Sequence, residues 1–139
     1  MIKESRARAL HDRFAVVPWL AMTLVATRAY RLDINDGVYN DFKDEPGLRE
    51  ECERGRTLGM DGKTLIHPSQ VGPCNEIFSP TEEDVDWSRK VIDTFGQAEN
   101  THKGVIVVEG RMVERLHFVM AQRTVAIAEQ IRDMEAACA

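Results

Sequence analysis

Three short segments combine side chains that can do chemistry with the glycine or proline of a loop. They are residues 36–42 (Asp-Gly-Val-Tyr-Asn-Asp-Phe), residues 59–70, which contain a His-Pro pair, and residues 107–112 (Val-Val-Glu-Gly-Arg-Met). Carboxylates and imidazoles transfer protons or hydrogen-bond a substrate oxygen. Each segment is therefore a candidate for ligand binding or acid/base chemistry.

Glu109 is the sharpest candidate for proton transfer. It precedes Gly110 in a turn that we expect between a strand, residues 105–108, and a long helix. A carboxylate on such a turn can be presented at the rim of a site, or into a neighbouring subunit, as a general acid or base. The alternative is a solvated turn acid without a function, and the local pattern leaves both open.

His67 follows a predicted strand directly. Its imidazole either hydrogen-bonds a substrate oxygen or holds its own loop in place. Pro68 makes that loop rigid, and Ser69 can cap a short helix that follows. For Lys63, just before the strand, we expect a structural or surface ion pair.

Asp36 and Gly37 form either a ligand-binding loop or an ordinary turn after a strand, in which Tyr39 and Phe42 are packing anchors. The acids around Gly37 do not fit a calcium loop of the EF-hand type. Such a loop needs glycine at its sixth position, and here it is the fifth residue counting from Asp33.

The elements that must position these segments alternate between helix and strand. The expected order is helix 18–30, strand 32–34, helix 45–58, strand 64–66, a short helix toward 77, a helix from 80 to about 99, strand 105–108 and a final helix of about 113–136. Two strands joined by a helix form a right-handed βαβ unit, whose strand ends share one sheet edge. The loops at 35–43 and 67–75 should therefore lie side by side where ligands bind.

Several helix ends are marked by their residues. Asp44 can cap the second helix and Gly59 can end it, and the Ser79-Pro80-Thr81-Glu82 segment is typical of a capping box. We expect the first helix to be covered on most sides because it is largely apolar. The last helix should bury one face, made of Leu116, Val119, Met120, Val125, Ile127 and Ile131.

Composition excludes several classes of protein. A net charge of −5 offers no basic face for nucleic acid. Three separated cysteines argue against a disulfide framework and for a reducing cytoplasm. The apolar run from Phe14 to Ala26 is too short to span a membrane, and we favour a helix over a secretory signal there. The 139 residues are fewer than the ~250 of a complete (β/α)8 barrel.

Taken together, the three segments resemble the acyl-CoA lyases of the HpcH/HpaI aldolase and citrate lyase beta subunit family, with malyl-CoA (beta-methylmalyl-CoA) lyase the nearest type. The resemblance runs from about Ala29 to Ile131, and residues 63–70 are its most specific part. It implies an α/β fold. Residues 1–78 would be the last two βα units of a partial (β/α)8 TIM barrel, and residues 79–139 a mostly helical cap of helix, strand and helix.

The resemblance also implies a reaction and a site. Such lyases cleave malyl-, citramalyl- or citryl-CoA by a magnesium-dependent retro-aldol reaction. The catalytic acid/base would be Glu109, lent to a neighbouring subunit, where the family has aspartate. The family's Mg²⁺ ligands lie upstream of anything matching Met1, so no residue here is assigned to the metal. The acyl-CoA edge would be lined by Asp36, Gly37, Tyr39, Asp41, Ile66, His67 and Pro68.

Two consequences follow for partners. A partial barrel leaves an open sheet edge and an apolar interior, so the chain should form a homo-oligomer or join a complementing barrel half. The alternative is a non-catalytic fragment, an oligomerisation or CoA-binding module with the same scaffold.

Overall fold

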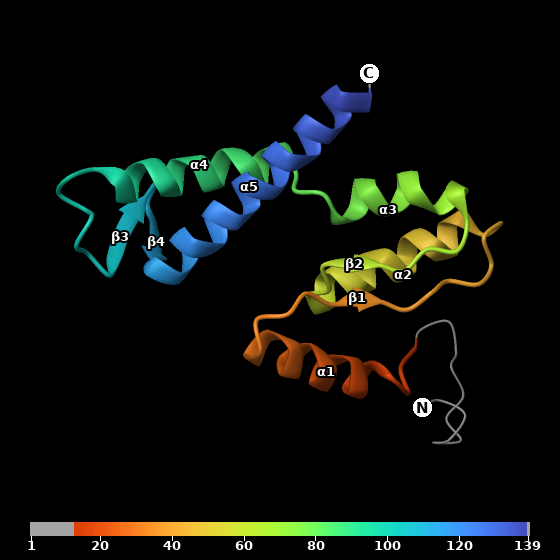
Figure 1. Cartoon of the computed structure of the whole chain (residues 1–139). Coiled ribbons are helices and arrows are strands. Elements are labelled where there is room, and N and C mark those ends of the chain that lie inside the picture. The colour runs from red at the N-terminus through yellow and green to blue at the C-terminus, as the bar shows by residue number, and fades with distance from the viewer. Residues whose placement is uncertain (1–12, 139) are drawn as a thin grey trace. The chain divides into compact units, whose positions relative to one another are not determined.

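The computed structural model describes residues 13–138, and the chain divides into two compact units. Unit 1 is Met1–Phe78 and unit 2 is Ser79–Ala139 (Figure 1). Each unit has its own cluster of buried apolar side chains. None of the helices in the described residues is long and apolar enough to cross a membrane.

Unit 1 contains one βαβ unit preceded by a helix. Its two strands pair in parallel, with Asn35 opposite Gly62 and Asp36 opposite Lys63, which confirms the expected parallel pair joined by a helix. The elements in chain order are α1 (Val17–Ala29), β1 (Asn35–Asp36), α2 (Glu45–Leu58), β2 (Gly62–Lys63), the 3-10 helix η1 (Pro68–Gln70) and α3 (Val71–Phe78).

The ends of α2 follow from its sequence. The Asp44 side chain accepts a hydrogen bond from the Gly47 amide at 3.1 Å, and Gly59 ends the helix with a left-handed φ of 105°. Both caps are as predicted. α2 packs on α3 through a core of Leu48, Cys52, Cys74 and Ile77.

The strands of unit 1 lie elsewhere than the apolar residues suggested. The ladder uses the polar residues 35–36 and 62–63 in place of 32–34 and 64–66. The physical reason is an ion pair between Asp36 and Lys63, which holds the strands together at that point. The cap of η1 also differs, because the His67 side chain accepts from the Ser69 amide and Ser69 is not the cap.

The expectation that α1 is covered on most sides is wrong. Met22 is 71% exposed and Val25 is 67% exposed. The apolar side chains of α1 are spread around the whole helix, and the described part of unit 1 covers only some of them.

Unit 2 is a hairpin at one end of two helices that lie side by side (Figure 1). The strands pair antiparallel, from Val105 opposite Glu114 to Val108 opposite Arg111. The elements are α4 (Glu82–Gly96), β3 (Val105–Val108), β4 (Arg111–Glu114) and α5 (Arg115–Cys138). The core consists of Val91, Phe95, Ile106, Val108, Val113 and Ala121.

The sequence predicted β3 and the Glu109-Gly110 turn correctly and missed β4. Residues 111–114 pair with β3, so α5 begins at Arg115 and not near Val113. The capping box is formed by Thr81 and Asp84, two residues later than expected, and α4 ends at Gly96.

The predicted buried face of α5 is also wrong. Leu116, Val119 and Met120 are 57–65% exposed, because α5 meets the core through Phe118 and Ala121. The more C-terminal Val125, Ile127 and Ile131 are half-buried.

Candidate functional site

The two loops that follow β1 and β2 lie side by side, as predicted. The rings of Phe42 and His67 stack with centroids 4.5 Å apart and planes inclined by 19°. The Ser69 hydroxyl reaches the Phe42 carbonyl at 3.5 Å, and the Gln70 amide donates to the Tyr39 carbonyl at 2.9 Å. Residues about 30 positions apart in the chain thus form one surface at the carboxyl edge of the strands.

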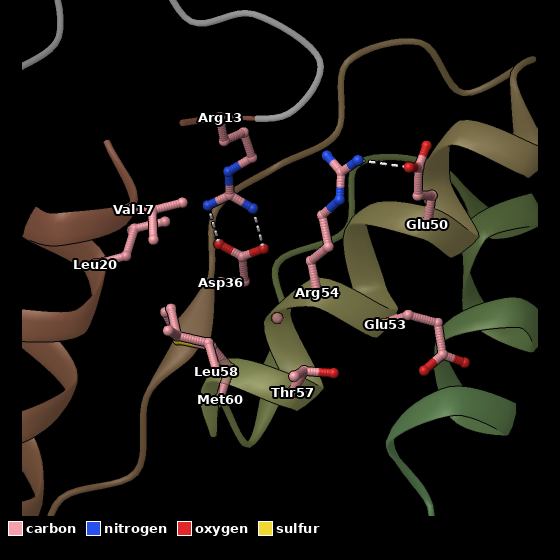
Figure 2. Close-up of a pocket in the computed structure, with 11 residues that line it drawn as sticks. Arg13, Val17, Leu20, Asp36, Glu50, Glu53, Arg54, Thr57, Leu58 and Met60 are labelled. Carbon is pink, nitrogen blue, oxygen red and sulfur yellow. Dashed lines mark hydrogen bonds and ion pairs between the residues drawn. The ribbon is translucent and has the colours of Figure 1, made fainter. Parts of the chain in front are cut away.

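Beneath this edge, Asp36 is buried among positive charges. Figure 2 shows the forked pair in which Nη1 and Nη2 of Arg13 each lie 2.6 Å from an Asp36 oxygen. Lys63 Nζ lies 3.1 Å from Asp36 and also contacts Glu51. The side chains of Asp36 and Lys63 have no exposed surface. The ion pair expected for Lys63 is therefore present and structural.

Asp36, which we expected at the ligand edge, has partners within the protein for both of its carboxylate oxygens. Its two oxygens accept from Arg13 and Lys63, and one also accepts from the Gly37 amide at 2.8 Å. Burial alone would raise the pKa of Asp36, but the Arg13 hydrogen bonds and the charges of Lys63 and Arg13 hold that pKa below its usual value. Asp36 is ionised and fixes the start of the loop.

Tyr39 also has a structural partner. Its hydroxyl donates to Asp44 Oδ2 at 2.6 Å. The hydrogen bond to Asp44, helped by burial, raises the pKa of Tyr39 to about 12, so the phenol stays protonated and bound to the cap of α2. Asp41 is exposed, and its Oδ1 accepts from the Lys43 amide at 3.2 Å.

His67 is exposed, and one of its ring nitrogens bonds within its own loop. Its Nδ1 accepts from the Ser69 amide at 3.2 Å and lies 2.8 Å from the Ser69 hydroxyl. Because Nδ1 accepts, the neutral ring carries its proton on Nε2. Gly37, His67 and Pro68 are exposed, and Ile66 is 51% exposed. The edge thus offers one imidazole donor beside apolar surface.

Sequence reasoning overlooked two residues that build this edge. Arg13 lies 23 positions before Asp36, and nothing local in the sequence indicates their pairing. Gln70 is only 1% exposed and bonds to both loops. A polar residue directly after a His-Pro-Ser turn is the one signal that could have drawn attention to it.

Glu109 lies in unit 2, at the tip of the hairpin. Its carboxylate is 2.7 Å from Lys90 Nζ, and both side chains are more than half exposed. Glu109 and Gly110 have φ angles of 47° and 79°, as a two-residue hairpin turn of type I′ requires. Asn, Asp and Gly favour such a turn, so the backbone does not explain a glutamate at position 109.

A cavity of about 410 Å³ opens beside Asp36 in unit 1 (Figure 2). α1 contributes Val17 and Leu20, and Leu58 and Met60 lie opposite. Within residues 13–138, no group of three or more His, Cys, Asp or Glu is placed to hold a metal ion.

Comparisons with known proteins show the family to which the chain is similar. The model of the C–C bond lyases of the TIM-barrel fold matches residues 2–131. A (3S)-malyl-CoA thioesterase of Cereibacter sphaeroides is 50% identical over 131 residues, 94% of this chain and 46% of the relative. The human mitochondrial citramalyl-CoA lyase is 34% identical over 79% of this chain and 32% of the relative. The chain spans about half the length of the curated relatives it matches.

Two solved structures resemble this one. The CitE protein of Mycobacterium tuberculosis, in complex with magnesium, acetoacetate and coenzyme A, is 28% identical with a TM-score of 0.60 over 76% of this chain and 38% of that chain. A citrate lyase of Burkholderia xenovorans LB400 has a TM-score of 0.59 at 18% identity, over 77% of this chain and 33% of that chain, which is a likeness of fold alone.

Replacing Asp36 with asparagine should lower the free energy of unfolding near pH 7 by about 3–5 kcal/mol, since it leaves buried cations without their main partner. The folded-state pKa is depressed, so this stabilisation is present above the unfolded-state pKa of about 4 and is lost as the pH falls through the folded-state value. The difference in the free energy of unfolding between the variant and the wild type should therefore become smaller in acid. Urea unfolding of the variant and the wild type, near pH 7 and in acid, tests this, and the exposed Asp41→Asn is the control. Equal stability of Asp36→Asn and wild type near pH 7 would contradict it.

Proposed function

The chain belongs to the C–C bond lyase family of the TIM-barrel fold, and from this premise we propose that it acts on 3-hydroxyacyl-CoA thioesters such as malyl-CoA. The observation that carries the proposal is the pair of loops at the carboxyl edge of β1 and β2. Ligands of parallel α/β folds bind at that edge. Relatives whose names include citramalyl-CoA and malyl-CoA support a thioester as the ligand.

In this proposal, unit 1 is the last two βα units of a barrel and unit 2 is its helical cap. A parallel strand pair connected by α2 is the repeating unit of a (β/α)8 barrel. The described residues contain no closed barrel, since their strands form two separate two-stranded sheets. The remaining strands would come from other parts of the protein or from a partner.

The side chains have distinct roles on the proposed edge. Gly37, Ile66 and Pro68 pack against the acyl-CoA, and the Nε2 proton of His67 hydrogen-bonds a ligand oxygen. Asp36 and Tyr39 hold their loop through Arg13 and Asp44, while Asp41 stays exposed beside it.

Glu109 is proposed to move the proton in carbon–carbon bond cleavage. In a retro-aldol step the 3-hydroxyl loses its proton to a base as the bond to the neighbouring carbon breaks, and the resulting enolate is then protonated. Magnesium would stabilise the developing negative charge. Residues 13–138 bring together no group of three or more His, Cys, Asp or Glu for such an ion, and we assign none of them to it.

A second reaction is thioester hydrolysis. Its support is the 50% identity to a (3S)-malyl-CoA thioesterase, against 36% to an L-malyl-CoA/beta-methylmalyl-CoA lyase. Both reactions begin with the same kind of thioester on the same edge. A third possibility is a CoA-binding or oligomerisation module without catalysis.

We also propose that the chain associates with a second copy or a barrel half in the cytoplasm. Unit 2 exposes six large apolar residues, each with 47–73% of its surface accessible. They are Val105, Val107, Met112, Leu116, Val119 and Met120. Several exposed apolar residues in one unit are typical of an interaction surface, whereas a single one would need no explanation. Cys52 and Cys74 are free thiols that share a hydrogen bond, with 3.4 Å between their sulfur atoms, and free thiols suit a reducing compartment.

Static light scattering of the purified chain at micromolar concentration checks the association. We expect a mass above that of the 139-residue monomer, because the apolar surface of unit 2 is costly to leave in water. A monomer at every concentration would contradict self-association and leave the barrel half as the proposed partner, to be tested by mixing the two.

The first functional experiment is incubation of the chain with (3S)-malyl-CoA, with Mg²⁺ or with EDTA. Lyase activity gives acetyl-CoA and glyoxylate, whereas hydrolysis gives malate and free CoA, and chromatography separates these products. We expect binding by calorimetry and one of the two product pairs. Binding without products would favour the non-catalytic module, and neither binding nor products would contradict the proposed function.

Glu109→Gln should lower the lyase rate by about 100-fold or more, because amide replaces the proton-transfer group. The free energy of unfolding should change by less than about 1 kcal/mol, since the ion pair with Lys90 lies at the surface. Glu114→Gln, in the adjacent strand, is a matched control that should retain activity. An unchanged rate would make Glu109 a solvated turn acid, and a large loss of stability would make it structural.

A further inference from the structure

Gln70 is a buried side chain that joins two loops of unit 1. It is 1% exposed and among the largest fully buried side chains of the described residues. Its Nε2 donates to the Tyr39 carbonyl at 2.9 Å, and its Oε1 accepts from the Ile66 amide at 3.0 Å. One amide thus uses both of its ends, each on a different loop.

The position of this contact matters because the strands are short. β1 and β2 have two residues each, and at their carboxyl ends one further backbone bond, from Thr64 N–H to the Asp36 carbonyl, extends the pairing. Beyond that point the backbones are no longer paired strand to strand. Tyr39 and Ile66 lie beyond it, so Gln70 links the loops where the ladder no longer does.

The other contacts between the two loops constrain the distance between them less strongly. The Phe42 and His67 rings stack at the exposed surface, and the Ser69 hydroxyl lies 3.5 Å from the Phe42 carbonyl. Stacked rings can slide, whereas two buried hydrogen bonds from one planar amide fix both a distance and an orientation.

We propose that Gln70 is a positioning residue that sets the spacing of the two loops, and with it the binding of the acyl-CoA thioester. This inference rests on the proposed function for its ligand, but the link between the loops is a property of unit 1 itself. Gln70 does not touch the proposed ligand. It acts through Tyr39 on one loop and through Ile66, next to His67, on the other.

The chemistry of the amide predicts which replacements fail. Glutamate has nearly the same shape and still accepts from the Ile66 amide, but an ionised carboxylate cannot donate to the Tyr39 carbonyl and is repelled by it. Leucine fills similar space and makes neither bond. If Gln70 only filled the core, leucine would bind ligand as well as glutamine does.

The test compares Gln70→Glu and Gln70→Leu with wild type, using coenzyme A as the probe in calorimetry well below the melting temperature. Gln122→Glu, at an exposed position of α5, makes the same charge change as a control. Two-dimensional NMR follows the Ile66 amide and the His67 ring, whose shift depends on stacking with Phe42. Circular dichroism identifies variants that stay folded. Gln70→Glu keeps the hydrogen bond from the Ile66 amide, so it remains a usable test variant if Gln70→Leu unfolds.

We expect folded Gln70→Glu to bind coenzyme A at least about tenfold more weakly, with a shifted His67 ring signal and with Gln122→Glu unchanged. Equal affinity in folded Gln70→Glu and wild type would overturn the proposal. If wild type binds no coenzyme A, the proposed function fails instead. The positioning role is then decided by NMR: a His67 shift in Gln70→Glu supports it, and an unshifted ring overturns it.

Discussion

The pairing of β1 with β2 depends on four charges, of which Asp36 and Lys63 are fully buried and Arg13 and Glu51 are partly exposed. Arg13 and Lys63 balance Asp36 and Glu51, and the ladder between the strands is only two residues long. A two-stranded sheet of that length is not stable by itself. A shift of one residue in register would separate Asp36 from Lys63 and leave buried charges unpaired. The ion pairs therefore specify the register, even though buried ion pairs contribute little net stability compared with apolar packing.

The register then determines which groups are left for chemistry. Several polar side chains near the loops are engaged in holding the structure: Asp36 by cations, Tyr39 by Asp44, and Gln70 by two backbone groups. His67 and the neighbouring apolar residue Ile66 remain exposed. Unit 1 thus separates residues that build the edge from residues that stay exposed on it. In the sequence both kinds occur in the same short segments, so residue type alone does not distinguish them.

The sequence predicted those features that depend on neighbouring residues and failed where distant residues meet. Asp44 and Gly59 bound α2 as expected, because a cap needs only a side chain and the next turn. The strands were misplaced because their position depends on charges far apart in the chain, and β4 was missed because residues 111–114 gain their conformation from pairing with β3. The pairing of Arg13 with Asp36 could not be predicted, because the two residues lie 23 positions apart and no local pattern links them.

The two sheets also differ in how much chain lies between the strands they pair. In unit 2, Val108 and Arg111 pair across a two-residue turn, whereas in unit 1, Asn35 meets Gly62 only after α2 has been placed between them. Closing a longer loop costs more entropy before its contacts form, and proteins rich in non-local pairs fold more slowly. We therefore expect unit 2 to fold first, although unit 1 is synthesised first. The nascent chain would carry an unfinished βαβ unit until its charged residues meet. The fluorescence of Trp19 in unit 1 and of Trp87 in unit 2 would report the folding of the two units separately.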